Sequence, residues 1–397
     1  MRLIPSRVVW TVAAAALLGG CAAGADATSP TWVPQPSVTL EAGPRVSLPN
    51  QPGQSPGSGP QQPGPNGPPS QSGSPGAGPD PNVVATDLTT PTGIALLPDG
   101  TALVGERTTG RIVRVQPQAG KPVTTVRRLS GLSTTGDGGL LDLALSPTYD
   151  EDGLVYAYVT TATDNRVIDF TLTGPATPVF TGIPRGTSDN TGRIMFDSDG
   201  MLEVGTGDAG HPQFAADKRS LAGKVLRIDA IGQPAPKNPT PRSAVFTRGH
   251  RTVDGLCENE ALGILYETEA PGDINLIEPG ADYGWPTPAK TSTRPVATLP
   301  AGRSGAGGCA ILGGRLYVAT SDGKSLLSAP VSPRTAVGKF SLALDGRYGR
   351  LRTVVAAPDG ALWLTTTNRD GHGSPVPADE RVLRIIPSAS GGSAPPV

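Results

Sequence analysis

The chain has 397 residues, with 33 Lys and Arg against 34 Asp and Glu, three His and three Cys. The balanced charge, and the lack of a basic stripe with interleaved aromatic residues, exclude a nucleic-acid partner. The length is sufficient for a sizeable buried core, although one long segment is too rich in Pro, Gly and Ser to contribute to it.

The N-terminal residues have the features of an export signal over 1–20. Arg2 and Arg7 precede an apolar run, 8–18, and small residues follow it. The run is too short to remain as a membrane-spanning helix. The sequence therefore predicts an exported protein.

The end of this signal, Leu18-Gly19-Gly20-Cys21, resembles the lipobox of bacterial lipoproteins. The resemblance implies that Cys21 is lipidated and becomes the mature N-terminus, which would anchor the protein at the cell membrane. The alternative is an ordinary signal that a cysteine happens to follow.

Residues 21–82 form a segment dominated by Pro, Gly, Ser and Gln. No aromatic or branched apolar residue occurs between Leu48 and Val83. Such a segment buries too little apolar surface to order itself. We expect a disordered tether that lifts the domain of residues 83–397 away from the membrane.

Residues 83–397 contain a repeated pattern. Each copy has a short apolar strand, a turn that is often Asp-Gly, an alternating strand and often a third strand like "GRIVRV". Asp-Gly between alternating apolar runs is a strong hairpin signal. The copies begin near residues 91, 137, 190, 249, 304 and 348.

Six copies at this spacing predict an all-β fold, a six-bladed β-propeller with four-stranded blades. The segment "NVVATDL" at 82–88 is expected to add the outer strand of the last blade and close the ring. Functional groups are expected where the first strand of each blade ends, and Ser146 follows such a strand.

Two cysteines remain in the exported domain, Cys257 and Cys309. Extracytoplasmic cysteines in even number favour a disulfide, and two buried free thiols are the alternative. No Cys-x-x-Cys or Cys/His spacing indicates zinc. A disulfide here would join the inner strands of neighbouring blades. It would stiffen the rim of the channel near Arg251, a residue discussed below.

Several phrases resemble one family, the soluble quinoprotein sugar dehydrogenases of the glucose/sorbosone dehydrogenase type. They are "GDGGLLDLALSPTY", "TGDAG", "SLAGKVLRID", "RGHRTVDGL", "DINLIEPGADYGWP" and "TTTNRDGHGSP". The low aromatic content and the leader are similar to the actinobacterial lipoprotein branch of that family. The resemblance implies a propeller that oxidises an aldose sugar with pyrroloquinoline quinone (PQQ) and calcium.

The resemblance also implies roles for individual residues. Ser146 occupies the position expected for the catalytic histidine, and a serine without an activating base is a poor proton acceptor at neutral pH. Arg251 and Thr252 take the place of an Arg-Asn pair that faces the quinone. Alternatively, Arg251 pairs with Asp254 or Glu258 at the rim.

Two further arginines, Arg350 and Arg352, match a pair that holds the quinone carboxylates, and alternation puts both on one strand face. The family also has a lysine in a turn of the preceding blade, and this chain has no clear counterpart of that lysine. Asp322 aligns there, with Lys324 two residues later. A charged strand end at the rim is the alternative interpretation of the two arginines.

The calcium loop of the family is shortened here, and Glu267, Glu269 and Asp273 remain as candidate ligands. A solvated acidic turn is the alternative. His211 and His372 lie in predicted loops, where either would serve as a substitute base or be a surface histidine.

The sequence thus leaves enzymatic activity open. One hypothesis is a membrane-anchored PQQ- and calcium-dependent sugar dehydrogenase, against which the serine at position 146 counts. The other is a non-catalytic propeller that binds a sugar, an envelope glycan or a partner protein. A calcium-dependent hydrolase or lactonase is a third and weaker hypothesis. We expect a monomer in each case.

Overall fold

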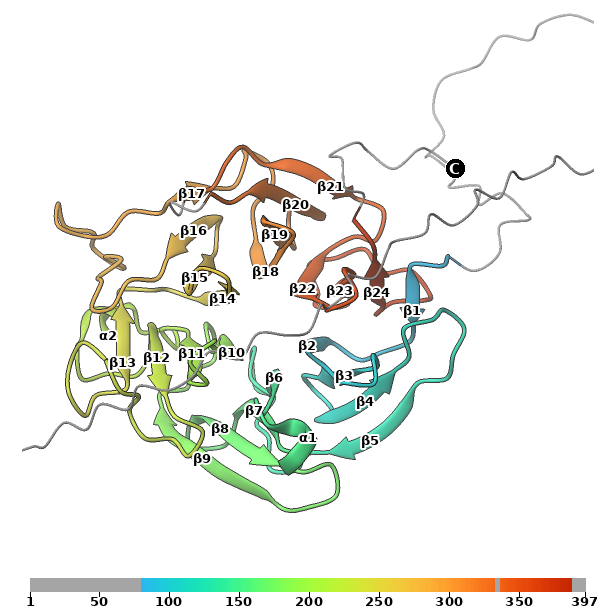
Figure 1. Ribbon diagram of the computed structural model, residues 1–397, viewed down its shortest axis with the longest axis horizontal. Helices are drawn as coiled ribbons and strands as arrows, with labels where there is room; N and C mark the ends of the chain where they lie inside the picture. Colours follow the sequence, from blue (N-terminus) through green and yellow to red (C-terminus); the bar gives the residue numbers. More distant parts are fainter. Residues whose placement is uncertain (1–79, 333–335, 388–397) are drawn as a thin grey trace, which may run out of the picture. The chain divides into compact units, whose positions relative to one another are not determined.

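The computed structural model describes residues 80–332 and 336–387, and these form six four-stranded antiparallel sheets. The sheets follow one another in chain order around a common centre, as the blades of a propeller (Figure 1). The predicted six-bladed fold is confirmed. The signal, Cys21 and the tether up to residue 79 lie outside the described residues.

The first strand of each blade is the innermost. These strands are β2 (Pro91–Leu96), β6 (Leu140–Leu145), β10 (Gly192–Phe196), β14 (Val253–Asn259), β18 (Ala306–Leu312) and β22 (Leu351–Ala356). The second strands are β3 (Ala102–Glu106), β7 (Val155–Thr160), β11 (Leu202–Thr206), β15 (Ile264–Glu269), β19 (Arg315–Thr320) and β23 (Leu362–Thr366).

The outer halves of the blades hold the remaining strands. The third strands are β4 (Arg111–Val115), β8 (Asn165–Phe170), β12 (Lys224–Ile228), β16 (Asp273–Leu276), β20 (Ser325–Pro330) and β24 (Val382–Ile385). The outermost are β5 (Thr124–Arg128), β9 (Ala176–Ile183), β13 (Val245–Arg248), β17 (Ala297–Thr298), β21 (Ser341–Asp345) and β1 (Val83–Ala85). Two short helices, α1 (Tyr149–Asp152) and α2 (Pro212–Ala216), lie in connections.

The ring closes as the sequence predicts. Strand β1, from the start of the domain, pairs antiparallel with β24 at its end and completes the last blade. Contacts with the propeller include residues on the N-terminal side of β1. Asp80 and Asn82, assigned to the tether, both hydrogen-bond the hydroxyl of Tyr348, at 2.8 and 3.3 Å.

The Asp-Gly turns behave as the sequence predicts. Between β2 and β3, Asp99 Oδ1 accepts a hydrogen bond from the Thr101 N–H at 2.9 Å, and Gly100 has a φ of 80°. Glycine adopts this left-handed conformation without the steric penalty of a Cβ. The same turn recurs in the β10–β11 and β22–β23 hairpins.

The hydrophobic core lies between neighbouring blades rather than at the centre. Trp363 of β23, which is 1 % exposed, packs in one cluster with Val104 and Val113 of the first blade. At the centre, the inner strands approach so closely that a Cβ on Gly93 would lie 2.6 Å from the Leu143 backbone nitrogen. Neighbouring inner strands are therefore closely packed, and polar groups from several blades contact one another inside the channel. Among the described residues, no helix is long and apolar enough to cross a membrane.

The predicted disulfide is present. Cys257 on β14 is bonded to Cys309 on β18, with 5.7 Å between their Cα atoms. It joins two inner strands, as expected, but not at the rim of Arg251. Cys257 lies six residues further along, roughly 20 Å on an extended strand. Both cysteines line a cavity of about 360 Å³ formed by the later halves of the inner strands.

Candidate functional site

The candidate site lies at the end of the channel where the inner strands begin, which we call the upper rim. Arg251 and Thr252 directly precede β14, and Arg350 directly precedes β22. The opposite end, where the inner strands finish, is the lower rim. Arg251, Thr252 and Arg350 therefore lie at the end opposite to the one where the sequence predicts functional groups.

Ser146 lies at the lower rim, immediately after β6. Its Oγ donates a hydrogen bond to Asp152 Oδ2 at 2.6 Å and lies 3.1 Å from Thr148 Oγ1. Because all inner strands run in the same direction through the channel, a residue after β6 is separated by the strand's length from Arg251. Ser146 therefore stabilises the β6–β7 connection at the lower rim, and the fold does not bring it beside the arginines of the upper rim.

Arg350 is buried between two carboxylates. Its Nη1 lies 2.7 Å from Asp322 Oδ1 and its Nε 3.2 Å from Asp370 Oδ2, while its side chain is only 10 % exposed. The backbone N–H of Arg350 donates to Asn368 Oδ1 at 2.8 Å. Lys324 is exposed, and Asp322 instead occupies the position beside the guanidinium.

Arg251 is half-exposed and also faces a carboxylate. Its Nε lies 3.7 Å from Asp189 Oδ1, and its guanidinium lies over the Trp285 ring, 5.4 Å from the centroid. This replaces the expected pairing with Asp254 or Glu258. Burial raises the pKa of Asp189, and Arg251 opposes that shift. Sequence patterns did not indicate Asp189, because it lies in a loop with no recognisable motif.

Thr252 is buried beside the channel and does not point to the open rim. Its Oγ1 donates to Asp254 Oδ2 at 2.8 Å. Asp254 in turn belongs to a group of charges inside the channel. Sequence reasoning missed this group, although charged residues within the apolar strands "GRIMF" and "LLDLAL" were a signal that could have revealed it.

Arg193 of β10 is the centre of that group. Its Nε donates to the Asp254 backbone oxygen at 2.6 Å, and its Nη1 lies 3.1 Å from Thr353 Oγ1 and 3.6 Å from Asp142 Oδ1. These partners belong to three other blades. Arg352, on the strand of Thr353, has a pKa lowered to about 10 by burial and by the neighbouring Arg193.

Asp254 gives the channel a pH-dependent contribution to stability. Burial raises its pKa from 3.8 to about 6. The unfolded chain therefore releases this proton at a lower pH than the folded protein, so stability is lost as pH rises from about 4 to about 6. The loss amounts to at most about 3 kcal/mol.

Asp254→Asn is expected to remove this loss while an amide oxygen still accepts from Thr252. Urea unfolding of both proteins at pH 4 and pH 7 measures the effect. The variant should gain stability relative to the natural chain at the higher pH. Parallel pH profiles for the two proteins would show that Asp254 titrates normally.

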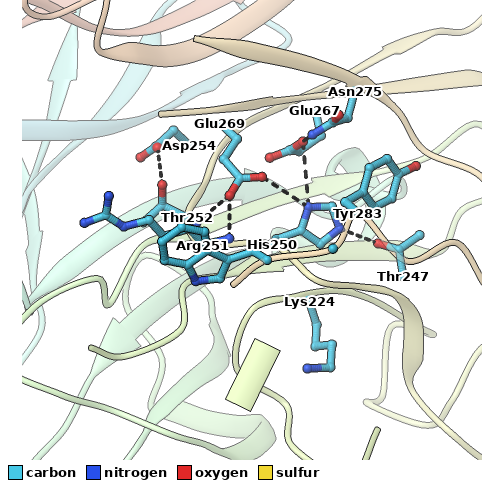
Figure 2. Close-up of polar contacts among 12 residues, drawn as sticks. Lys224, Thr247, His250, Arg251, Thr252, Asp254, Glu267, Glu269, Asn275 and Tyr283 are labelled. Atoms are coloured by element: carbon cyan, nitrogen blue, oxygen red, sulfur yellow. Dashed lines mark hydrogen bonds and ion pairs between the residues drawn. The ribbon is translucent and has the colours of Figure 1, made fainter. Parts of the chain in front are cut away.

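The three predicted metal ligands do not converge as expected. Glu267 and Glu269 of β15 point toward His250, and their ligand atoms and that of His250 all lie within 4.8 Å of one another (Figure 2). Burial and the neighbouring Glu269 raise the pKa of Glu267 well above its usual value. Asp273 is partly exposed and instead lines a cavity with Glu269.

This cavity, which we call the rim cavity, has a volume of about 270 Å³. It lies between the β15–β16 hairpin and the loop after Trp285, and Arg251 is at its edge. Trp285 forms part of its wall and is held by a hydrogen bond from its Nε1 to Asp208 Oδ2 at 2.8 Å. The two other candidate bases, His211 and His372, are exposed on loops.

The residues present do not fit a tricarboxylate quinone. Arg350 is already paired with two carboxylates, and Arg251 faces a third. A ligand with three carboxylates would have to displace these partners and would meet their negative charge. Calcium fits no better, because only Glu269 and Asp273 of the predicted ligands reach the cavity, whereas calcium takes six to eight oxygen ligands.

Known proteins are nevertheless clearly similar. The family profile described as Glucose / Sorbosone dehydrogenase matches residues 88–306. The PQQ-bound aldose sugar dehydrogenase of Streptomyces coelicolor is 39 % identical, with a TM-score of 0.72, covering 76 % of this chain and 95 % of that one.

Two curated relatives match over shorter stretches. Quinoprotein glucose dehydrogenase B of Acinetobacter calcoaceticus is 28 % identical over 250 residues, 52 % of each chain. An aldose sugar dehydrogenase of Escherichia coli is 26 % identical over 229 residues, 51 % of this chain and 61 % of the relative. The matched part thus spans about half the length of these relatives. From its profile match and its propeller, the chain belongs to the glucose/sorbosone dehydrogenase family.

Proposed function

We propose that this protein is a non-catalytic, sugar-binding member of the family, held at the outer face of the cell membrane by a lipid on Cys21. The observation that carries the proposal is the double pairing of Arg350 with Asp322 and Asp370. In a quinone-dependent enzyme this arginine would be available to a cofactor carboxylate.

The charge of the upper rim supports this proposal. Asp189 and Asp322 stand beside the two arginines that would otherwise attract an anion. Arg350 makes one charge-assisted contact to each of two carboxylates, and its own guanidinium is largely buried, so a competing carboxylate would have to displace a partner. A rim neutralised in this way favours an uncharged ligand over a polyanion.

The rim cavity has the features of a sugar site. Trp285 and Tyr283 supply aromatic wall, and Arg251, Glu269 and Asp273 supply donors and acceptors at its edge. Sites for small ligands combine an apolar or aromatic wall with a few placed polar groups. A neutral sugar or the end of an envelope glycan matches this chemistry. Because the proposed protein only binds the sugar and does not oxidise it, no electron acceptor is required.

The lipid anchor rests on the sequence alone. The signal over 1–20, the lipobox-like Leu18-Gly19-Gly20-Cys21 and the Pro- and Gly-rich tether together favour an exported lipoprotein. Mass analysis of the N-terminal peptide from membrane fractions would detect the acyl chains.

Cofactor binding is the decisive test. We expect that the full chain does not bind PQQ in calorimetric titration with calcium present, whereas a panel of neutral sugars and glycans includes a ligand. Asp322→Lys should bind PQQ measurably, at least about tenfold more tightly than the detection limit set for the natural chain, because it removes a repelling charge beside Arg350 and adds an attracting one.

Asp359→Lys is the matched control. Asp359 is an exposed aspartate of the blade of Arg350 that pairs with Arg384 in the β22–β23 hairpin, at the lower rim. It makes the same change in net charge and should leave PQQ binding unaltered. Tight, calcium-dependent PQQ binding by the natural chain, followed by reduction of an artificial acceptor with an aldose, would establish the dehydrogenase instead.

A further inference from the structure

We propose that His250, Glu267 and Glu269 form a buried structural site for a divalent transition-type cation, of which zinc is the best match. The three side chains come from two segments: His250 from the turn before β14 and the two glutamates from β15. The proposal concerns the inside of the blade: Glu269 also borders the rim cavity, but the test below measures metal binding and does not depend on a sugar ligand.

The geometry brings three ligand atoms around one point. His250 Nδ1 lies 3.6 Å from Glu269 Oε2 and 3.9 Å from Glu267 Oε2 (Figure 2). Ligand atoms around tetrahedral zinc are about 3.4 Å apart, given zinc–ligand distances of about 2.0–2.2 Å. Small side-chain movements would therefore complete the coordination.

The imidazole is oriented for this role by its other nitrogen. His250 Nε2 lies 2.8 Å from Thr247 Oγ1, and the ring packs 4.6 Å from that of Tyr283. These contacts fix the ring and leave Nδ1 directed at the two glutamates. A hydrogen-bond partner on the remote nitrogen is the usual arrangement of a metal-binding histidine.

Three buried atoms around the site lack a hydrogen-bond partner. They are His250 Nδ1, Glu267 Oε1 and Asn275 Oδ1. His250 and Glu267 are fully buried, and Asn275 is 2 % exposed. A buried polar group without a partner is destabilising, and native proteins pair most such groups or place an ion or water beside them. A cation at the centre would satisfy the imidazole nitrogen and the carboxylates together.

Charge balance points in the same direction. With the imidazole neutral and both carboxylates ionised, as metal binding requires, the cluster carries two negative charges in a dry environment. The side chain of Arg251 points away toward Asp189 and Trp285. Lys224 Nζ is held by the backbone oxygens of Phe214, Ala215 and Ala222. A divalent cation would neutralise the cluster.

The donor set discriminates between metals. Calcium and magnesium prefer oxygen ligands and more of them, whereas an imidazole with carboxylates suits zinc or a neighbouring transition ion. The cation also has a route to the site. Glu269 and Asn275 line the rim cavity as well as the cluster, so the cavity leads directly to it.

Metal analysis of the full chain, folded with Zn²⁺ present and then dialysed, tests the proposal. We expect about one zinc per chain. Glu267→Gln should weaken Zn²⁺ binding by roughly 100-fold or more, since loss of even a supporting partner costs 10- to 100-fold. Replacing Zn²⁺ with Co²⁺ gives a visible spectrum that reports nitrogen and oxygen coordination.

Glu278→Gln is the matched control, because Glu278 is an exposed glutamate of the same blade. It should retain one zinc with unchanged affinity. Less than about a tenth of an equivalent of zinc per chain, in protein folded with Zn²⁺, would overturn the proposal. The two glutamates would then share a proton instead of a metal ion. Equal Zn²⁺ affinity in Glu267→Gln, His250→Gln and the natural chain would also overturn it, since the metal would then be bound elsewhere.

Discussion

Replacing both Cys257 and Cys309 with alanine is expected to lower the free energy of unfolding by about 4 kcal/mol. The disulfide closes a loop with a sequence separation of 52 residues, and the loss of chain entropy in the unfolded state scales with the logarithm of that length. For a domain of this size the apparent Tm should fall by roughly 5–8 °C. Calorimetry of the natural and double-variant chains measures both quantities.

Single substitutions separate the covalent bond from packing. If the cross-link is responsible, Cys257→Ala and Cys309→Ala should each cost nearly as much as the double variant, because each already breaks the bond. Additive costs, or a natural chain whose Tm is unchanged by reducing agent, would show that side-chain burial dominates instead.

Arg193→Met is expected to cost about 3–5 kcal/mol of stability. The guanidinium holds Asp142, Asp254 and Thr353, which belong to three other blades. Its removal leaves Asp142, which is 6 % exposed, as a buried carboxylate without its ion pair. Urea unfolding monitored by tryptophan fluorescence provides the measurement.

Two further variants identify the mechanism. Asp142→Asn in the Arg193→Met background should recover at least about 1 kcal/mol, because the amide oxygen still accepts from the Ile194 N–H but carries no charge. Arg303→Met breaks a pair with exposed Asp345 and one hydrogen bond to the Gly323 backbone oxygen, and it should cost less than about 1 kcal/mol. Equal losses for Arg193→Met and Arg303→Met would contradict a structural role for the channel charges.

The propeller could be predicted from the sequence because its signals are local. Asp-Gly turns at 99–100 and 359–360 fix hairpins, and alternating strands such as β4 fix the period of two. Six such units have few alternatives to a closed ring, since an open end would expose strand edges. The closing strand β1 followed from the same strand pattern, whereas the disulfide was predicted from the even number of cysteines in an exported domain.

The composition of the candidate site could not be predicted in the same way. It depends on which end of the channel each side chain reaches, and local sequence patterns say little about that position. Ser146 and Arg251 both border inner strands, but one follows its strand and the other precedes its own, so the fold places them at opposite rims. Likewise Glu267, Glu269 and Asp273 look like one acidic loop in the sequence. The hairpin turns two of them inward to His250 and leaves Asp273 at the rim cavity.

The sequence by itself determined the fold class, the blade order and the cysteine pair, because each follows from local strand and turn patterns or from a simple count. It also predicted the ring closure, because the last repeat lacked an outer strand that the first segment of the domain could supply. Only the tertiary structure decided that Arg350 is paired with Asp322 and Asp370, and that Arg193 connects four blades. Those contacts join residues from loops and strands that are distant in sequence. Their charges affect function through spatial proximity, which arises only when the six blades close around the channel.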